Sequence, residues 1–258
     1  MDPSEYQQIV EYLNLAERTQ YSAADIQARF QSEPASSYGE HMDRWIPDFD
    51  YAHQLLLDCL AIHLPPPAGG APQAAAVELG AGTGRVSQLL LQAFPALRLT
   101  LVDLSPNMLA AAALRLAPYG NRCRLVEHDI FAPGLDIAPG SLDAVVSVFA
   151  ICHARGSQVY AQLYRRIHTW LKPGGIFICY DHVLGDSSAL TALNALGWHR
   201  LLRASQTAAE AREGIVGTYQ EDSPLALREH LALLGAAGFS AADVLHKRDI
   251  FAIYLGVK

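Results

Sequence analysis

Three glycines stand at every second position in the segment VELGAGTGR, residues 77–85, between an apolar run and a helix-like stretch. A strand, a glycine turn and a helix together present backbone N–H groups to a ligand. The order of Gly80, Gly82 and Gly84 departs from the Gly-x-Gly-x-x-Gly fingerprint of dinucleotide sites. Glu78 precedes the turn, and a carboxylate there would repel a pyrophosphate but can bind an ammonium, directly or through water. The segment predicts a cradle for an amine-bearing ligand, with no phosphate required.

Acids also end the next two predicted strands. Asp103 follows the run LRLTLV, and its carboxylate can accept both hydroxyls of a ribose. Asp129 lies in VEHDIF, where a carboxylate can accept the exocyclic amine of an adenine while Ile130 offers apolar contact. Leu104 and Met108 can wall the other side of that ring. Together, Glu78, Asp103 and Asp129 therefore predict a ligand that carries an amine, a ribose diol and an adenine.

Each of these residues also has a structural interpretation. The glycines can serve tight packing alone, and Asp129 can be a turn residue before FAPG. Asp103 can cap the next helix, but Ser105 already stands at that N-cap with Pro106 at the first helical position. Asp103 would also suit a nicotinamide cofactor, although the glycine spacing, Glu78 and Asp129 argue against one.

Apolar runs alternate with helix-like segments after the glycine turn. Continuous Val/Ile/Leu runs separated by helices predict a parallel sheet covered on both faces. The last two strands, residues 241–248 and 249–257, are joined so closely that they must pair antiparallel. We predict an α/β fold with a doubly wound, seven-stranded, mostly parallel sheet whose last strand is antiparallel.

The chain divides by composition into three parts. Residues 1–64 show helical spacing with Ser or Asp at each expected N-cap, including Asp48, and predict a helical cap or lid. Residues 65–74 are rich in Pro, Gly and Ala and predict a linker. Residues 75–258 form the main domain, with a turn at KPGG and a helical insertion at about 184–220.

Five ordered motifs carry a resemblance to a known family. VELGAGTG, LTLVDLSPNML, LVEHDI, LDAVVSVFAICH and LYRRIHTWLKPGG resemble the successive motifs of class I S-adenosylmethionine-dependent methyltransferases, in order over residues 75 to about 183. The resemblance implies that residues 80–84, including Ala81, hold the methionyl part of S-adenosylmethionine, Asp103 the ribose and Asp129 the adenine. The segment DRWIPDFD also resembles, over a short stretch, the entry helix of small-molecule methyltransferases and of carboxy-S-adenosylmethionine synthases.

Methyl transfer from a sulfonium depends mainly on alignment and the exclusion of water, and a general base helps when the acceptor is a hydroxyl or an ammonium. Phe149 and His153 follow the fourth strand, and Asp181 and His182 end the fifth. We predict His153 and His182 as candidate bases, Asp181 as the acid that orients one of them, and Phe149 as a contact of the donor. Either histidine can instead be structural. No third ligand stands at a suitable spacing from Asp181 and His182, so no metal is predicted, and Cys152 is expected to be a buried small side chain.

The helical cap at residues 1–64 and the insertion at about 184–220 contain aromatic and cationic side chains that can line a cleft. We predict that Arg44 pairs with the carboxylate of the donor. The candidate contacts of the acceptor are Tyr38, Trp45, Trp198, His199 and Tyr219. Arg165 and Arg166 are expected on a solvated helix face.

The composition argues against some classes of binding partner. The formal net charge of -7 argues against a general electrostatic grip on nucleic acid or an anionic membrane. Four widely spaced cysteines and the lack of a secretory signal or a long apolar run favour reduced thiols in a cytoplasmic protein. We predict S-adenosylmethionine-dependent methylation of a small molecule, with self-association left open. The alternatives are carboxy-S-adenosylmethionine synthesis, a sulfonium-assisted cyclisation, a tRNA or protein acceptor, a nicotinamide-dependent oxidoreductase and a non-catalytic methyltransferase-like partner.

Overall fold

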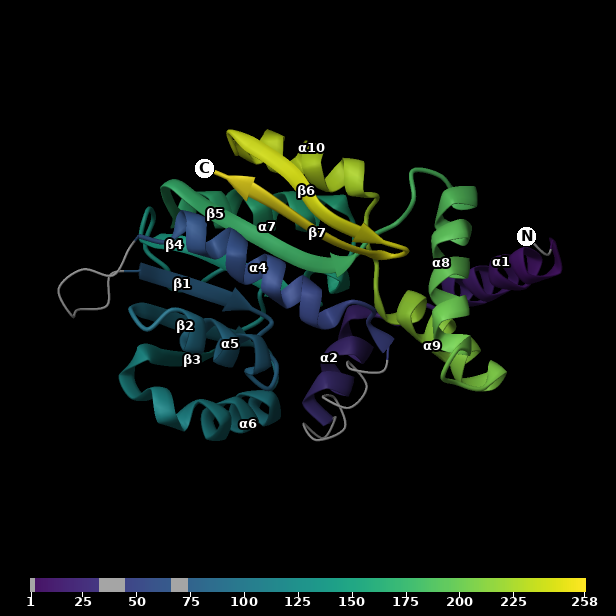
Figure 1. Cartoon of the computed structure of the whole chain (residues 1–258), viewed down its shortest axis with the longest axis horizontal. Helices are drawn as coiled ribbons and strands as arrows, with labels where there is room; N and C mark the ends of the chain where they lie inside the picture. Colours follow the sequence, from purple (N-terminus) through teal and green to yellow (C-terminus); the bar gives the residue numbers. More distant parts are fainter. Residues whose placement is uncertain (1–2, 33–44, 66–73) are drawn as a thin grey trace.

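A computed structural model describes residues 3–32, 45–65 and 74–258 (Figure 1). Its centre is one seven-stranded sheet. The strands are β1 (Ala74–Leu79), β2 (Leu97–Asp103), β3 (Cys123–Glu127), β4 (Leu142–Val148), β5 (Leu171–His182), β6 (Ala241–Arg248) and β7 (Phe251–Val257).

The strands lie in the order β3-β2-β1-β4-β5-β7-β6. The pairs from β3 to β5 are parallel, whereas β7 is antiparallel to both β5 and β6. The sheet prediction is thus confirmed, including the tight pairing of the last two strands. The order reverses beside β1, so the carboxyl ends of β1 and β4 border the crevice in which open α/β sheets bind ligands.

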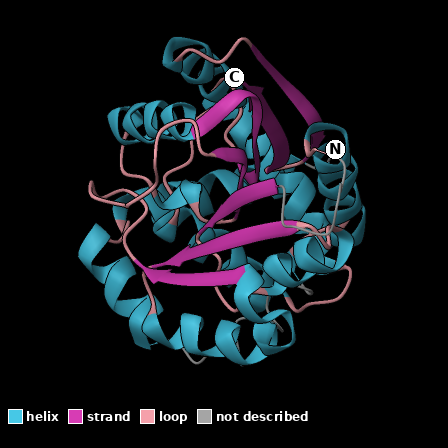
Figure 2. Cartoon of the chain, turned by 90° about the vertical axis from the view of Figure 1, so that its left-hand side faces the viewer, coloured by secondary structure: helices cyan, strands magenta, loops and turns pink. Residues whose placement is uncertain are grey.

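Helices cover both faces of the sheet, as Figure 2 shows. One face carries α4 (Phe49–His63), α5 (Arg85–Ala93) and α6 (Pro106–Leu116), and the other carries α7 (Ser157–Trp170) and α10 (Leu227–Ala237). Each face has its own apolar core, because the strand side chains alternate between the two. A sheet buried on both faces explains the continuous apolar runs of the central strands.

The remaining long helices gather beyond the carboxyl ends of β1, β4 and β5 (Figure 1). They are α1 (Pro3–Arg18), α2 (Ala23–Ser32), α8 (Ser188–Arg203) and α9 (Ala208–Glu221). Helices α1, α8 and α9 pack on one another, so the N-terminal segment and the segment after β5 build one structure. We call these four helices the lid. A helical insertion after β5 was predicted and is present.

Local details correct three sequence predictions. Asp48 does not cap α4: it has a φ of 54° and no capping bond, and its carboxylate instead accepts a 2.6 Å hydrogen bond from Arg248. The KPGG segment lies inside β5, where the pairing of β4 with β5 shifts register as a bulge. Arg166 does not lie on a solvated face, as described below.

Two further predictions concern the cysteines and membrane-spanning helices. All four cysteines are free thiols. Among the residues that the structure describes, no helix combines the length and the apolar character needed to cross a bilayer.

Candidate active site

The glycine turn needs glycines for both conformation and space. Gly80, Gly82 and Gly84 have φ values of 71°, 52° and 75°, which L side chains rarely adopt. The N–H of Gly80 donates to the carbonyl of Val102 at 2.8 Å, which ties the turn to β2. A Cβ on Gly80 would lie 2.1 Å from the Cβ of Ala150, so the turn is pressed against the segment that follows β4. The backbone of the turn is therefore fixed from two sides.

Asp103 is held by backbone donors at the end of β2. Its Oδ2 accepts the N–H of Gly82 at 2.7 Å, and its Oδ1 accepts the N–H of Ser105 at 2.8 Å. Ser105 caps α6 as predicted, since its Oγ accepts the N–H of Met108 at 3.3 Å. Burial raises the pKa of Asp103, and the bonds from Ser105 and Gly82 oppose that rise. Each oxygen keeps a further lone pair, which is what a pair of ribose hydroxyls requires.

Glu78 lies behind the glycine turn. Its side chain is 2% exposed, and its carboxyl accepts a short hydrogen bond from Ser87 in the first turn of α5. Burial raises its pKa to about 8, and the nearby charge of Asp103 adds to the rise while Ser87 opposes it. The carboxyl is thus mostly protonated near neutrality and points at α5, an arrangement that the sequence does not reveal.

The loop after β3 is fastened by one arginine. Arg166 of α7 donates to the carbonyls of Ile130 at 2.9 Å and Phe131 at 3.0 Å, and also to that of Ala132. Asp129 accepts the N–H of Phe131 at 2.8 Å through Oδ1. Burial lowers the pKa of Arg166, and Asp129 opposes that change. Arg166 therefore has a structural task at the predicted adenine end, and the expectation of a solvated face was wrong.

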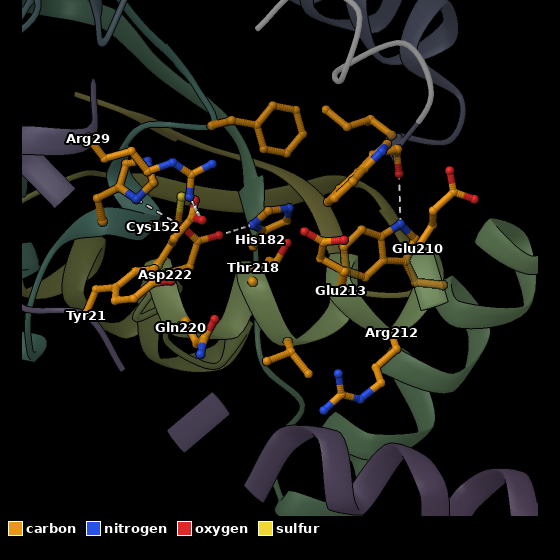
Figure 3. Close-up of a pocket in the computed structure, with 18 of the residues that line it drawn as sticks. Tyr21, Arg29, Cys152, His182, Glu210, Arg212, Glu213, Thr218, Gln220 and Asp222 are labelled. Carbon is orange, nitrogen blue, oxygen red and sulfur yellow. Dashed lines mark hydrogen bonds and ion pairs between the residues drawn. The ribbon is translucent and has the colours of Figure 1, made fainter. Parts of the chain in front are cut away.

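A cavity of about 1000 Å³ lies between the lid and the carboxyl edge of the sheet (Figure 3). Helices α2 and α9 supply one side of it, and the ends of β4, β5 and β7 supply the other. Its lining includes six residues named in the sequence analysis, namely Trp45, Phe149, Cys152, His153, His182 and Trp198. The cavity thus brings together both candidate bases, Phe149 and two of the predicted acceptor contacts.

One carboxylate at the floor of this cavity contacts two imidazoles. Asp222, directly after α9, places Oδ1 3.0 Å from Nδ1 of His153 and Oδ2 in a short hydrogen bond with Nδ1 of His182. The His153 contact has the distance of an ion pair without the alignment of a hydrogen bond. Figure 3 shows Asp222 beside the His182 ring. Burial alone would raise the pKa of Asp222, but the two histidines outweigh it and hold that pKa well below its usual range. Asp222 is therefore ionised.

His153, which contacts Asp222, also interacts electrostatically with the predicted donor end of the site. It lies close enough to Asp103 to favour the ionised form of that carboxylate, although burial remains the larger influence on its pKa. The ring of His153 is also 5.0 Å from that of Phe30 on α2. The imidazole thus lies within electrostatic reach of the predicted ribose acid and also contacts Asp222 at the cavity floor.

Asp181 is arranged differently from the prediction that it orients a histidine ring. It is 1% exposed, and its oxygens accept the backbone N–H groups of His182 and Cys152, each at 2.9 Å. It bonds to neither imidazole, and it ties the end of β5 to the turn after β4. Burial raises its pKa, and the neighbouring imidazole of His182 opposes that rise.

Three potential metal ligands meet at the same floor. One ligand atom from each of Cys152, His182 and Asp222 lies within 4.8 Å of the others. The sequence predicts no metal here because Asp222 follows His182 by 40 residues and no spacing pattern joins them. Burial raises the pKa of the Cys152 thiol, and Asp181 and Asp222 raise it further, so the protonated thiol is favoured.

Not all of the predicted acceptor contacts line this cavity. Trp198 and Trp45 do, and Trp198 donates from Nε1 to the carbonyl of Trp45 at 2.8 Å. His199 instead lines a second cavity of about 510 Å³ between α1 and α8. The hydroxyl of Tyr219 is buried with no hydrogen-bond partner among the described residues. Two more candidates, Tyr38 and Arg44, lie outside the described residues.

Comparison with known proteins identifies the domain. Residues 76–175 match a family model described as a methyltransferase domain. Thiol S-methyltransferase TMT1B of Homo sapiens is 32% identical over 118 residues, which are 45% of this chain and 45% of that protein. The ubiquinone/menaquinone biosynthesis C-methyltransferase UbiE of Syntrophotalea carbinolica is 34% identical over 99 residues, 38% of this chain and 40% of that protein. This chain thus spans less than half the length of these two relatives.

A solved structure is similar in fold over the full length of this chain. The S-adenosylmethionine-dependent methyltransferase SibL superposes with a TM-score of 0.62 at 16% identity, over 100% of this chain and 70% of that one. The family model, the curated relatives and this architecture agree with the ordered motifs of the sequence. Residues 76–175 therefore match a methyltransferase domain, and the chain shares the fold of S-adenosylmethionine-dependent methyltransferases.

Proposed function

We propose that this chain transfers the methyl group of S-adenosylmethionine to a small molecule held in the cavity between the lid and the sheet. The contact of Asp222 with both His153 and His182 carries the proposal, because it places an oriented proton acceptor at the cavity floor. His153 also lies within electrostatic reach of Asp103, which supports a meeting of donor and acceptor near this floor.

The donor end fits the cofactor. The glycine turn leaves no room for a Cβ at Gly80, and Asp103 has lone pairs free for the ribose. Asp129 would accept the adenine amine on the loop that Arg166 holds. The ring would pack against the apolar side chains of Leu104, Met108 and Ile130. When bound, the cofactor supplies an electrophilic methyl group on a positively charged sulfur.

Asp222 sets the tautomer of His182. A carboxylate that accepts from Nδ1–H leaves the lone pair on Nε2. No described residue bonds to Nε2 of His182, and its ring lines the cavity. This Nε2 can therefore receive the proton of an acceptor hydroxyl, and the ionised Asp222 stabilises the imidazolium that results.

The lid excludes water from this site. Arg29 of α2 forms an ion pair with Glu221 at the end of α9, one residue before Asp222. Asn107 of α6 donates to the carbonyl of Gln31 at 2.7 Å, which ties α2 to the donor side. The lid thereby touches both halves of the site. The net charge of -7 supports a small acceptor over a nucleic acid.

The test uses the full chain with S-adenosylmethionine and two fractions of a cell extract, one of filtered small molecules and one of retained macromolecules. Mass spectrometry is expected to find S-adenosylhomocysteine and a singly methylated product with the small-molecule fraction. Product only with macromolecules would reject the small acceptor, and binding of the cofactor without turnover would favour a non-catalytic partner. A carboxylated sulfonium product would identify carboxy-S-adenosylmethionine synthesis instead.

A second experiment, with a chelator, distinguishes proton transfer by the histidines from catalysis by a bound metal ion. We expect dialysis against EDTA to leave turnover unchanged, because the histidines act with Asp222 and without an ion. A loss that zinc restores would show that Cys152, His182 and Asp222 hold a metal.

A further inference from the structure

Each imidazole that contacts Asp222 has an aromatic neighbour that lines the cavity. The ring centroid of Phe30 lies 5.0 Å from that of His153, with the planes tilted by 59°. The ring centroid of Phe149 lies 5.2 Å from that of His182, tilted by 51°. These two pairs come from different parts of the chain, α2 with the turn after β4 in one and the ends of β4 and β5 in the other.

Further aromatic surface borders the same space. Trp45 is half-buried and Tyr21 is 41% exposed, and both line the cavity. We call Tyr21, Phe30, Trp45 and Phe149 the aromatic lining. An aromatic ring in a ligand packs well against such side chains, in offset or edge-to-face geometry. The lining therefore favours a planar, unsaturated acceptor over a flexible aliphatic one.

Two carboxylates at the inner end of the cavity are already paired. Glu221 pairs with Arg29, and Asp222 pairs with the two histidines. A cationic acceptor would have to compete with these pairs for either carboxylate. On the α9 side, Thr218 and Gln220 add neutral polar groups, as Figure 3 shows. An uncharged ring with polar substituents suits this combination.

The acidity of the acceptor favours one kind of hydroxyl. A phenolic hydroxyl has an ordinary pKa of about 10, whereas an aliphatic hydroxyl resembles water, at about 15.7, so a phenol gives up its proton more readily to a neutral imidazole. A thiol, at about 8.5, needs little help from a base. Among hydroxyl acceptors, a phenol is thus the better match to an imidazole whose Nε2 faces the aromatic lining.

We infer that the acceptor is a phenolic compound whose ring packs against Phe30 and Phe149 and whose hydroxyl donates to Nε2 of an imidazole that Asp222 holds. This inference rests on the proposed function. The phenolic oxygen forms a bond to the methyl carbon as the carbon–sulfur bond breaks. The electron pair of that bond stays on sulfur and gives neutral S-adenosylhomocysteine, and the phenolic proton moves to Nε2.

The experiment uses acceptors that share one ring and differ in the nucleophile: 4-methylphenol, benzyl alcohol, benzylamine and benzyl mercaptan. Formation of S-adenosylhomocysteine and of each methylated product is measured with the full chain. We expect kcat/KM for 4-methylphenol to exceed that for benzyl alcohol and benzylamine by about 100-fold or more. Preferred methylation of the amine, alcohol or thiol would overturn the phenol and leave the proposed function standing.

A second measurement tests the ring without requiring turnover. Binding of 4-methylphenol and of 4-methylcyclohexanol is compared by calorimetry in the presence of S-adenosylhomocysteine. We expect the aromatic compound to bind about 10-fold more tightly, and Phe30→Leu to remove most of the difference. Phe94→Leu is the matched control, because Phe94 is half-buried between α5 and β2 and does not line the cavity. Equal binding of the two compounds by the unaltered chain would overturn the inference. Failure of the proposed function is distinct, because no extract fraction would then yield S-adenosylhomocysteine.

Discussion

The Asp222 carboxylate contacts Nδ1 of His182, which precedes it by 40 residues in the chain. Asp222 directly follows α9 of the lid, and His182 is the last residue of β5 in the sheet. The contact therefore joins the lid to the sheet at the point where the proposed proton transfer occurs. A second contact, from Asp222 to His153, makes the same carboxylate a neighbour of the donor end.

Asp222→Asn should abolish most turnover while leaving cofactor affinity within a factor of about two. The amide keeps the shape of the side chain but removes the charge that stabilises an imidazolium, and it can select the wrong tautomer. We expect kcat to fall by about 100- to 10,000-fold. Glu221→Gln is the control, since it removes the adjacent acid without a contact to either histidine. Comparable losses in both variants would reject the specific role of Asp222.

Arg166→Ala should weaken binding of S-adenosylmethionine by roughly 5- to 30-fold, as measured by calorimetry. Three carbonyls of the loop after β3 lose their donor, so the loop that carries Asp129 is no longer held. Arg165→Ala offers a matched comparison, because Arg165 is exposed on the same helix. Its affinity should stay within about twofold. Unchanged affinity in Arg166→Ala would show that the loop does not depend on this arginine.

Gly80→Ala should cost more than Gly140→Ala, although both glycines have a positive φ. The values are 71° and 63°, so the conformational penalty is similar, on the order of 1 kcal/mol. Only Gly80 meets an atom, the Cβ of Ala150, whereas a Cβ on Gly140 finds nothing within 4 Å. We expect urea unfolding to show an extra loss of about 1–3 kcal/mol for Gly80→Ala, together with lost cofactor binding. Equal losses would mean that Ala150 moves aside freely.

Glu78 should make the protein less stable as pH rises. Its pKa is about 8 in the folded chain, above an ordinary 4.5. The folded state therefore binds the proton more tightly, so the stabilisation is complete below about pH 4.5 and is lost as pH rises to about 8. Glu78→Gln should remove this slope and be more stable than the unaltered chain at pH 8.5 by on the order of 2 kcal/mol.

Urea unfolding at several pH values between 5 and about 8.5 checks this expectation. Asp136→Asn controls for a general effect of removing an acid, since Asp136 is partly exposed in the loop before β4. A Glu78→Gln variant with the same pH slope as the unaltered chain would contradict the buried, protonated carboxyl.

The sheet and the cofactor family could be predicted because their determinants are local. Continuous apolar runs show strands buried on two faces, and Gly80, Asp103 and Asp129 each stand at a strand end that the pattern locates. Ser105 and Pro106 marked the start of α6 for the same reason. Because these signals depend on a few adjacent residues, they are the same however the lid is arranged.

Several contacts around the site could not be predicted, because the sequence does not show which groups the fold packs together. Nothing in YQED distinguishes Asp222 from a solvated acid at the end of a helix, and only the packing of α9 brings it to His182. Arg166 looked solvated because its partners, the carbonyls of Ile130 and Phe131, leave no trace in side-chain spacing. Glu78 was expected to face the ligand, since Ser87 alone does not reveal a buried hydrogen bond.

The position of Asp222 also bears on how such an enzyme can be re-engineered. If a lid were exchanged between relatives to change the acceptor, the position of the junction relative to Asp222 would matter. Chimaeras joined directly after α9, before Asp222, would keep the native aspartate, and those joined after it would import a foreign residue. Under the proposed function, the junction of the graft would therefore decide whether a hybrid keeps the carboxylate that contacts both histidines.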